Sequence, residues 1–147
     1  ISEAGLPGVA DPGAQAALAA HRRGIRVVPL VGPSSILMAL MSSGQNGQSF
    51  AFNGYLPIKE PERSRAIRSF ERRAMTEGQC QIFIEAPYRN IKLMQTMLAT
   101  LSPRSLLTLA CDITSPAESI STRSVEEWRH TALPDMAKRP TIFILGI

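Results

Sequence analysis

The stretch that decides the fold class runs from residue 14 to residue 41 and reads AQAALAAHRRGIRVVPLVGPSSILMALM. Its alanine-rich start, residues 14–23, favours a helix, and Gly24 is typical of a left-handed C-terminal cap. Residues 25–30 are largely apolar and predict a buried parallel strand. Residues 36–41 predict a second helix after a turn. This order of helix, strand, loop and helix is typical of an α/β sheet with helical crossovers.

The rest of the chain continues the alternation. Residues 45–48 are polar and contain glycine, and residues 50–57 are predicted to be extended up to a proline. Apolar runs and amphipathic patterns then predict helices at 61–76, 90–101 and 125–130, and strands at 81–85, 106–111 and 141–147. We therefore expect an α/β fold with two domains, residues 1–49 and residues 50–147.

The composition favours a protein with a packed core outside membranes. The chain has 147 residues, of which 44% are hydrophobic, and no apolar run approaches the roughly 20 residues that a membrane-spanning helix needs. We expect a cytoplasmic location, with Cys80 and Cys111 as buried free thiols in apolar surroundings. No cysteine and histidine cluster has the spacing of zinc ligands, so no metal site is expected. The formal net charge of +4 mildly favours phosphate-bearing partners.

The start of the chain is unusual for a domain. It begins at Ile1 without a methionine and leads directly into a loop. We therefore expect a fragment of a longer protein, with the strand before Ile1 missing and the first domain incomplete. A sheet edge left open in this way should pair with another copy or aggregate.

Two loops are candidates for ligand binding. Residues 2–13, SEAGLPGVADPG, contain three glycines and two prolines, which fix the backbone path, while the small side chains let a ligand approach the main chain. Residues 31–35, VGPSS, follow a predicted strand and open a helix, where free backbone N–H groups suit an anion or a carboxylate. Purely structural alternatives remain open: the first loop could be only a connection between a strand and a helix, and Ser34 could be only a helix cap.

Four motifs in order carry a family resemblance: SEAGLPGVADPG, IRVVPLVGPSS, FAFNGYLPIK with Arg63 after it, and IFIEAPYR. This order resembles the tetrapyrrole methylase superfamily and, within it, the small-subunit rRNA (cytidine-2′-O)-methyltransferases. The resemblance spans nearly the whole chain. This sequence departs from the family at Glu3, Leu6 and Tyr88, where Asp, Thr and His are usual.

The resemblance implies two α/β domains that bind S-adenosylmethionine (SAM) in the cleft between them, in a protein that is usually a homodimer. It implies donor contacts from both loops and from the second domain, at Ala4, Gly5, Leu6, Val9, Ser34, Ser35, Ile84, Thr114, Thr141 and Ile142.

Polar candidates for the chemistry lie close to these positions. Glu85 lies at the carboxyl end of a predicted strand, where sites of α/β proteins gather, and is a candidate base or orienting group. It could equally pair with Arg89 and anchor the turn. Lys59, Arg63 and Arg89 are candidates for binding the substrate, with Lys59 and Arg63 on RNA phosphate. A stripe of Arg65, Arg68 and Arg72 either extends that surface or is a solvated face partly neutralised by Glu62 and Glu71.

The resulting hypothesis is a SAM-dependent methyltransferase that acts on a ribose 2′-hydroxyl of small-subunit rRNA. Two alternatives stay open: a methyltransferase for a tetrapyrrole or corrinoid small molecule, and a non-catalytic RNA-binding domain on the same fold.

Overall fold

The structure, a computed structural model, describes residues 6–147. The chain divides into two compact units, Ile1–Ser35 and Ile36–Ile147. Each unit is described by itself.

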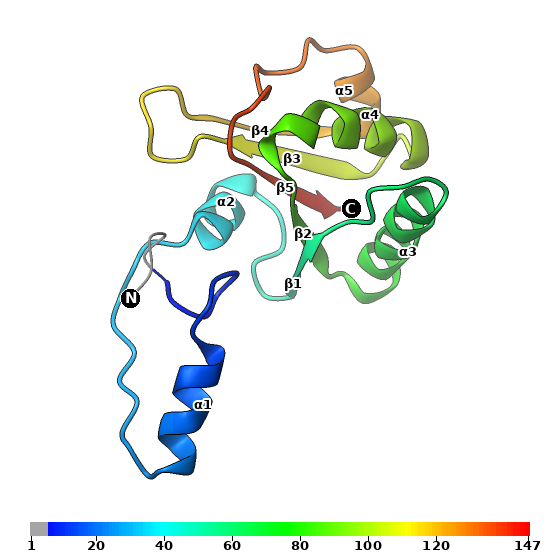
Figure 1. The fold of residues 1–147 in the computed structure, drawn as a ribbon. Coiled ribbons are helices and arrows are strands. Elements are labelled where there is room, and N and C mark those ends of the chain that lie inside the picture. Colours follow the sequence, from blue (N-terminus) through cyan, green and yellow to red (C-terminus); the bar gives the residue numbers. More distant parts are fainter. Residues whose placement is uncertain (1–5) are drawn as a thin grey trace. The chain divides into compact units, whose positions relative to one another are not determined.

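The second unit is built on a mixed five-stranded sheet with the order β1-β2-β5-β3-β4 (Figure 1). Strand β1 pairs in parallel with β2, and the other pairings are antiparallel. The strands are β1 (Phe50–Tyr55), β2 (Cys80–Ile84), β3 (Leu106–Cys111), β4 (Ser119–Ser124) and β5 (Thr141–Gly146). The predicted α/β class is confirmed, and so are the strands predicted in this unit. Sequence analysis missed β4, because SISTRS has no apolar run and forms an edge strand.

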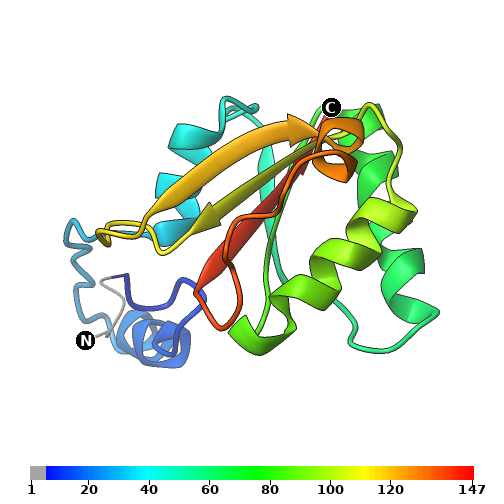
Figure 2. The same ribbon diagram turned by 90° about the horizontal axis from the view of Figure 1, so that it is seen from above.

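Helices cover both faces of this sheet (Figure 2). Helix α2 (Ser35–Ser43) buries Ile36, Ala39 and Leu40 on one face, against Ile82, Ala110, Ile142 and Ile144. The other face carries α3 (Glu62–Glu77), α4 (Asn90–Thr100) and α5 (Val125–Arg129). Among the helices within residues 6–147, none has both the length and the apolar character that a membrane span requires.

The segment after α2 is fastened to the sheet by side chains. Gln45 Nε2 donates to Thr108 Oγ1 (2.7 Å) and to the carbonyl of Ile144 (3.2 Å). Thr122 Oγ1 donates to the carbonyl of Ser43 (2.7 Å). These contacts explain why α2 groups with the second unit, whereas sequence analysis assigned residues up to 49 to the first domain. This grouping of contacts does not test the division into domains 1–49 and 50–147, which stays a prediction.

The described part of the first unit contains a loop, helix α1 (Ala14–Arg22) and an extended segment. Helix α1 ends as predicted, since Gly24 has a φ of +66°. Its N–H donates to the carbonyl of His21 (3.1 Å), and the N–H of Ile25 donates to the carbonyl of Ala20 (2.9 Å). This pair of bonds satisfies carbonyls that the helix end would otherwise leave without a donor.

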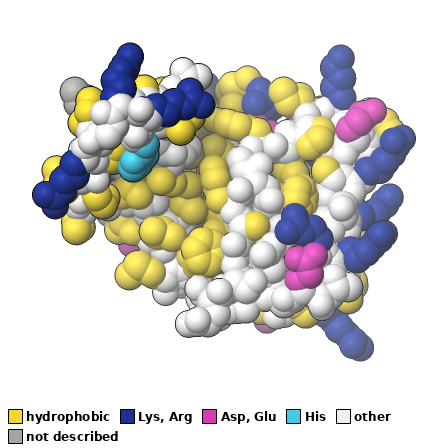
Figure 3. Space-filling model, turned by 90° about the horizontal axis from the view of Figure 1, so that it is seen from below, with side chains coloured by type: hydrophobic (Ala, Val, Ile, Leu, Met, Phe, Trp, Pro, Cys, Tyr) yellow, Lys and Arg dark blue, Asp and Glu magenta, His cyan; other side chains and the backbone are white. Residues whose placement is uncertain are grey.

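The strand predicted at residues 25–30 is wrong for this structure. The segment has no regular secondary structure, and the side chain of Leu30 is 85% exposed. A strand is stabilised by hydrogen bonds to neighbouring strands, and the described part of the first unit contains no strand that could pair with this segment. Figure 3 shows apolar side chains spread over the surface of this unit, consistent with the exposed Ile25, Val28 and Val31.

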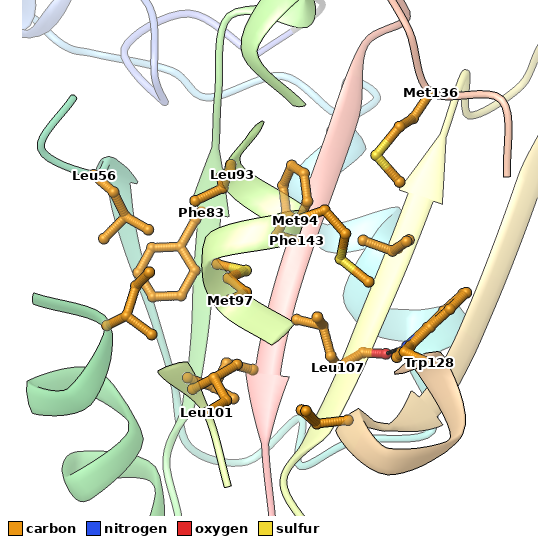
Figure 4. Packing of buried hydrophobic residues seen from close by; sticks show 14 of the residues in the cluster. Leu56, Phe83, Leu93, Met94, Met97, Leu101, Leu107, Trp128, Met136 and Phe143 are labelled. Atoms are coloured by element: carbon orange, nitrogen blue, oxygen red, sulfur yellow. Dashed lines mark hydrogen bonds between the residues drawn. The ribbon is translucent and has the colours of Figure 1, made fainter. Parts of the chain in front are cut away.

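The hydrophobic core of the second unit lies between the sheet and α3, α4 and α5 (Figure 4). Alternation along β2 and β5 sends Phe83 and Phe143 into this core and sends Ile82 and Ile144 toward α2. Trp128 of α5 donates its Nε1–H to the carbonyl of Leu107 (2.7 Å), which satisfies the polar atom of a buried ring. This packing fixes the strand ends that carry the candidate site.

Candidate functional site

One edge of the sheet gathers the residues that sequence analysis selected in the second unit. Strands β1, β2 and β3 run in the same direction, so their carboxyl ends share this edge with the start of β5. The register pairs Ile84 with Ile142, and Cys111 with Thr141. Glu85 follows Ile84 directly, and Thr114 lies three residues after β3. Ligands of open α/β sheets bind at this kind of edge.

Glu85 is buried at this edge between two arginines. Its side chain is 1% exposed. Oε2 accepts from the guanidinium of Arg63 (3.2 Å), while Oε1 accepts from Arg89 Nε (2.9 Å) and from the backbone N–H of Ala86 (2.8 Å). Each carboxylate oxygen therefore has a charged donor. The arrangement favours Glu85 as an orienting group and not as a free base, because a base needs an oxygen turned toward the substrate.

Arg63 faces inward, and this corrects its predicted role on RNA phosphate. Its side chain is 1% exposed, and its Nε donates to the carbonyl of Pro57 (2.7 Å). The NH1 atom is buried without a hydrogen-bond partner in the described part of the chain. Its burial removes Arg63 from the surface on which a polyanion lies, and its charge is used to hold Glu85. Sequence analysis did not separate it from the exposed arginines of α3.

Of the other substrate candidates, Lys59 is exposed in the loop before α3, and Arg89 is partly exposed, with 22% of its side chain accessible. The hydrogen bond from its guanidinium to Glu85 is the main reason why the pKa of Arg89 is raised above the ordinary arginine value. Both side chains therefore remain candidates for contact with a substrate at this edge.

The turn after β3 holds Thr114 in a restricted conformation. Asp112 and Thr114 both have positive φ, +47° and +71°. Asp112 Oδ2 accepts from Arg139 Nε (2.6 Å), and the N–H of Thr114 donates to Glu118 Oε2 (2.7 Å). Positive φ is costly for a β-branched residue and persists where the surroundings fix it, often at functional sites. Thr114 is exposed at this turn, so it stays a candidate for donor contact.

Asn90 is a buried residue of the edge that sequence analysis missed. Its Nδ2 donates to the carbonyls of Met136 (3.2 Å) and Arg139 (2.7 Å) and to Thr141 Oγ1 (3.1 Å). It therefore ties the start of α4 to the segment that leads into β5 and fixes Thr141. The available signal was an asparagine at the start of a predicted helix, directly after the IFIEAPYR motif.

The candidates in the first loop are described only in part. Ala4 and Gly5 lie outside the described residues. The N–H of Val9 donates to the carbonyl of Leu6 (3.3 Å), so these residues form a turn. Leu6 also lines a largely apolar hollow of about 630 Å³ inside the first unit.

The candidates in the second loop lie where the two units divide. Ser34 is partly buried, and Ser35 is the exposed first residue of α2. The predicted donor contacts of both loops stay predictions. Within residues 6–147, no cluster of histidine, cysteine, aspartate and glutamate could hold a metal ion.

Solved structures share this fold. The methyltransferase CobJ matches 97% of this chain and 61% of its own, with a TM-score of 0.59 and 22% identity. The cobalt precorrin-4 methyltransferase CbiF covers the same shares with a TM-score of 0.60 and 13% identity. Uroporphyrin-III C-methyltransferase from Thermus thermophilus, complexed with S-adenosylhomocysteine, matches with a TM-score of 0.51 and 20% identity over 97% of this chain and 62% of its own. The chain therefore has the fold of these tetrapyrrole methyltransferases.

Curated relatives are more similar in sequence, although no family model matches the chain. The relative from Vibrio cholerae is 35% identical over 120 residues, 82% of this chain and 40% of its own length. The relative from Neisseria meningitidis serogroup B is 36% identical over 127 residues, which are 86% of this chain and 42% of its own length. The relative from Mesorhizobium japonicum is 32% identical over 147 residues, which are 99% of this chain and 49% of its own length.

The chain thus spans less than half the length of these relatives. Each of them is named ribosomal RNA small subunit methyltransferase I. At this identity and coverage, the chain belongs to the family of ribosomal RNA small subunit methyltransferase I.

Proposed function

We propose that this protein is a SAM-dependent methyltransferase that modifies a ribose 2′-hydroxyl of small-subunit rRNA. The relatives' name supports the RNA acceptor over a tetrapyrrole, and the structural neighbour complexed with S-adenosylhomocysteine supports the donor. The observation that carries the proposal is the sheet edge at which Ile84, Thr141 and Ile142 lie beside the fixed carboxylate of Glu85.

The chemistry of this edge fits an adenosyl ligand. Ile84 is partly buried, Ile142 and Thr141 beside it are buried at 6% and 4% exposure, and Asn90 fixes the hydroxyl of Thr141. Small-molecule sites combine apolar walls with a few placed polar groups in this way. We propose that these residues bind the donor together with the two loops and Thr114, the loop residues being Ala4, Gly5, Leu6, Val9, Ser34 and Ser35.

The protein's own contribution to methyl transfer is positioning. The donor's sulfonium supplies an activated methyl group, so the chain must hold the acceptor oxygen in line with it. In our proposal Glu85 acts through Arg89: the buried carboxylate fixes the guanidinium, and the guanidinium holds the substrate. The hydrogen bonds of Glu85 to Arg63 and to the N–H of Ala86 keep this carboxylate in one orientation.

The arginine stripe of α3, defined as Arg65, Arg68 and Arg72, fits the RNA backbone. All three side chains are exposed, and none forms an ion pair with another residue of the described chain. Glu71 forms no ion pair with them in the described chain, and its Oε1 accepts from the N–H of Ser102 and from Ser105 Oγ, both at 2.6 Å. Figure 3 shows lysine and arginine side chains projecting along the α3 side of the second unit. Phosphate contacts of this kind supply affinity and position.

The start of α3 connects this stripe to the candidate site. Arg63, in the first turn of α3, contacts Glu85 at the carboxyl edge of the sheet. The stripe therefore begins near this edge and extends about 10 Å along the helix, at 1.5 Å per residue. RNA bound along α3 would thus reach the edge at which we place the donor.

The test is transfer of labelled methyl groups from SAM to small-subunit rRNA. It uses the chain alone and the chain joined to the part of the Mesorhizobium japonicum relative that it does not match. We expect RNA label that survives alkaline hydrolysis as a protected dinucleotide, because a methylated 2′-oxygen cannot attack the adjacent phosphate. Label in a tetrapyrrole acceptor and none in RNA would support the small-molecule alternative. No transfer by either protein would contradict the proposal.

We also propose a cytoplasmic homodimer. The cytoplasm agrees with an rRNA substrate and with the two cysteines, which are free and buried. Burial raises the pKa of both thiols and keeps them in the less reactive protonated form. The exposed apolar side chains of the first unit favour association with a second copy.

A further inference from the structure

The chain has only two tyrosines, and both lie exposed at the carboxyl edge of the sheet. Tyr55 ends β1 opposite Ile84 of β2 and is 64% exposed. Tyr88 lies three residues after Glu85, in the short helix η1 (Pro87–Arg89), and is 70% exposed. The two rings thus flank the carboxyl end of β2, and packing of the core accounts for neither of them.

A buried network holds the ring of Tyr88. The guanidinium of Arg89 lies 4.7 Å from the centre of the ring, and its NH1 donates to the tyrosine hydroxyl. Arg89 is in turn held by Glu85 (2.8 Å), and Glu85 is held by the buried Arg63. An exposed aromatic side chain is thereby connected through Arg89 and Glu85 to the protein interior.

Tyr55 belongs to the same cluster. It lies on the neighbouring strand opposite Ile84, the residue directly before Glu85, and it adds to the raised pKa of Arg89 after Glu85 and Tyr88. A pair of rings around a fixed arginine matches how proteins bind unpaired bases, which stack on aromatic faces and on guanidinium planes. The fixed orientation also reduces the entropy lost when a base stacks.

We propose that Tyr88 and Arg89, with Tyr55 beside them, stack on an unpaired base of the RNA substrate and thereby position its nucleotide at the sheet edge. The inference rests on the proposed function, since it specifies how the same site recognises RNA. The arginine stripe favours RNA as the ligand, because it provides phosphate contacts that begin at the same edge. Glu85 is a positioning residue in this account, because it acts through Arg89, whereas Tyr88 and Arg89 contact the base.

The experiment measures binding of a fluorescent single-stranded oligoribonucleotide and of the same strand with abasic positions. Tyr88→Leu removes the aromatic face, Tyr88→Phe keeps it, and Met75→Ala is the control at another exposed apolar side chain. We expect Tyr88→Leu to weaken binding of the intact strand roughly 5- to 100-fold, as stacking of a base on an aromatic residue implies. We expect Tyr88→Phe and Met75→Ala to bind it nearly as well as the unchanged protein.

The abasic strand separates stacking from a structural effect. The unchanged protein should prefer the intact strand to the abasic strand, and Tyr88→Leu should lose most of this preference while its salt dependence stays the same. Equal preference in the unchanged protein and in Tyr88→Leu would overturn the inference. So would a Tyr88→Leu variant that loses affinity for a carboxylated porphyrin and not for RNA. If base preference depends on Tyr88 but no methyl group is transferred to rRNA, the proposed function fails and the stacking surface stands.

Discussion

At the residue scale, the network of Arg63, Glu85 and Arg89 determines which role Glu85 can have in the candidate site. Sequence analysis placed Glu85 at the end of a strand and left open whether it is a base, an orienting group or the partner of Arg89. The structure confirms the pairing with Arg89 at 2.8 Å and adds Arg63, which is 22 residues away in the sequence. That contact depends on how α3 packs on the sheet, so no local pattern could have predicted it.

The network gives a prediction about stability. Glu85→Gln leaves the charge of Arg63 buried without a carboxylate, and we expect it to lower the free energy of unfolding by about 3–5 kcal/mol. The double variant Arg63→Met and Glu85→Gln removes the stranded charge and should be more stable than Glu85→Gln alone. Urea unfolding measures both. Equal stability of Glu85→Gln and the unchanged chain would show that the network does not hold this edge.

At the element scale, apolar patterns predicted the helices and the strands that find partners in the sheet, but not the apolar segment 25–30, which has no partner strand in the described chain, or the polar strand β4. Helix α3 follows its amphipathic pattern, since Ile67 and Ala74 are buried, and the ring of Phe70 packs edge-on against Phe83 at 5.1 Å. Residues 25–30 have the composition of a strand but no partner strand in the described part of their unit. Strand β4 is polar, yet it pairs with β3 along its whole length. Strand formation depends on these partners, and composition alone does not reveal them.

Helix α5 gives a prediction with a pH dependence. Ser124 and Glu127 form a capping box, in which Ser124 Oγ accepts from the N–H of Glu127 (3.1 Å) and Glu127 Oε2 accepts from the N–H of Ser124 (2.8 Å). Ser124→Ala should lower the free energy of unfolding by about 1 kcal/mol at neutral pH.

The acid side of the profile tests the same cap. The backbone hydrogen bond from Ser124 is the main cause of the lowered pKa of Glu127, and the bond from its hydroxyl adds to it. This stabilisation is therefore present above the ordinary glutamate pKa and is lost as the pH falls through the lowered value. Thermal unfolding of the unchanged chain and of Ser124→Ala, measured from neutral to acid pH, should show that Ser124→Ala loses less stability as the pH falls. Parallel curves would contradict the role of the cap.

The arginine stripe of α3 gives a prediction about RNA binding. Replacing Arg68 and Arg72 by glutamine should weaken RNA binding and reduce the slope of log affinity against log salt by roughly 1–2, because fewer counterions are released. Arg123→Gln on β4 is the control, since it removes a positive charge at the other end of the strand order. An unchanged salt slope in the α3 variant, or an equal loss in the control, would count against RNA on this helix.

At the scale of the whole molecule, the fold class and the family could be predicted from the sequence, because four motifs in order and alternating helices and strands support each other. The donor contacts of the first loop stay a prediction, and Ala4 and Gly5 lie outside the described residues. The exposed apolar side chains of residues 25–31 are the largest departure from the expected packing. They indicate the surface through which we expect two copies to associate.

This surface gives a prediction about oligomeric state. Light scattering of the chain at high concentration should give a mass above that of the monomer. Val28→Lys with Leu30→Lys should shift the mass toward the monomer, because both side chains are exposed in the unchanged chain, at 53% and 85%. Met75→Lys in α3, another exposed apolar position, is the control and should leave the association unchanged. A monomeric unchanged chain would contradict the proposal.

The most direct test of the central claim is a titration of the ¹⁵N-labelled chain with S-adenosylhomocysteine, followed by NMR. The account predicts that shifted amides gather at the carboxyl edge of the sheet, at Ile84, Glu85, Thr114, Thr141 and Ile142. Shifts confined to the opposite edge, around Gln45 and Gly146, or no shifts at millimolar ligand, would contradict the claim that this edge binds the methyl donor.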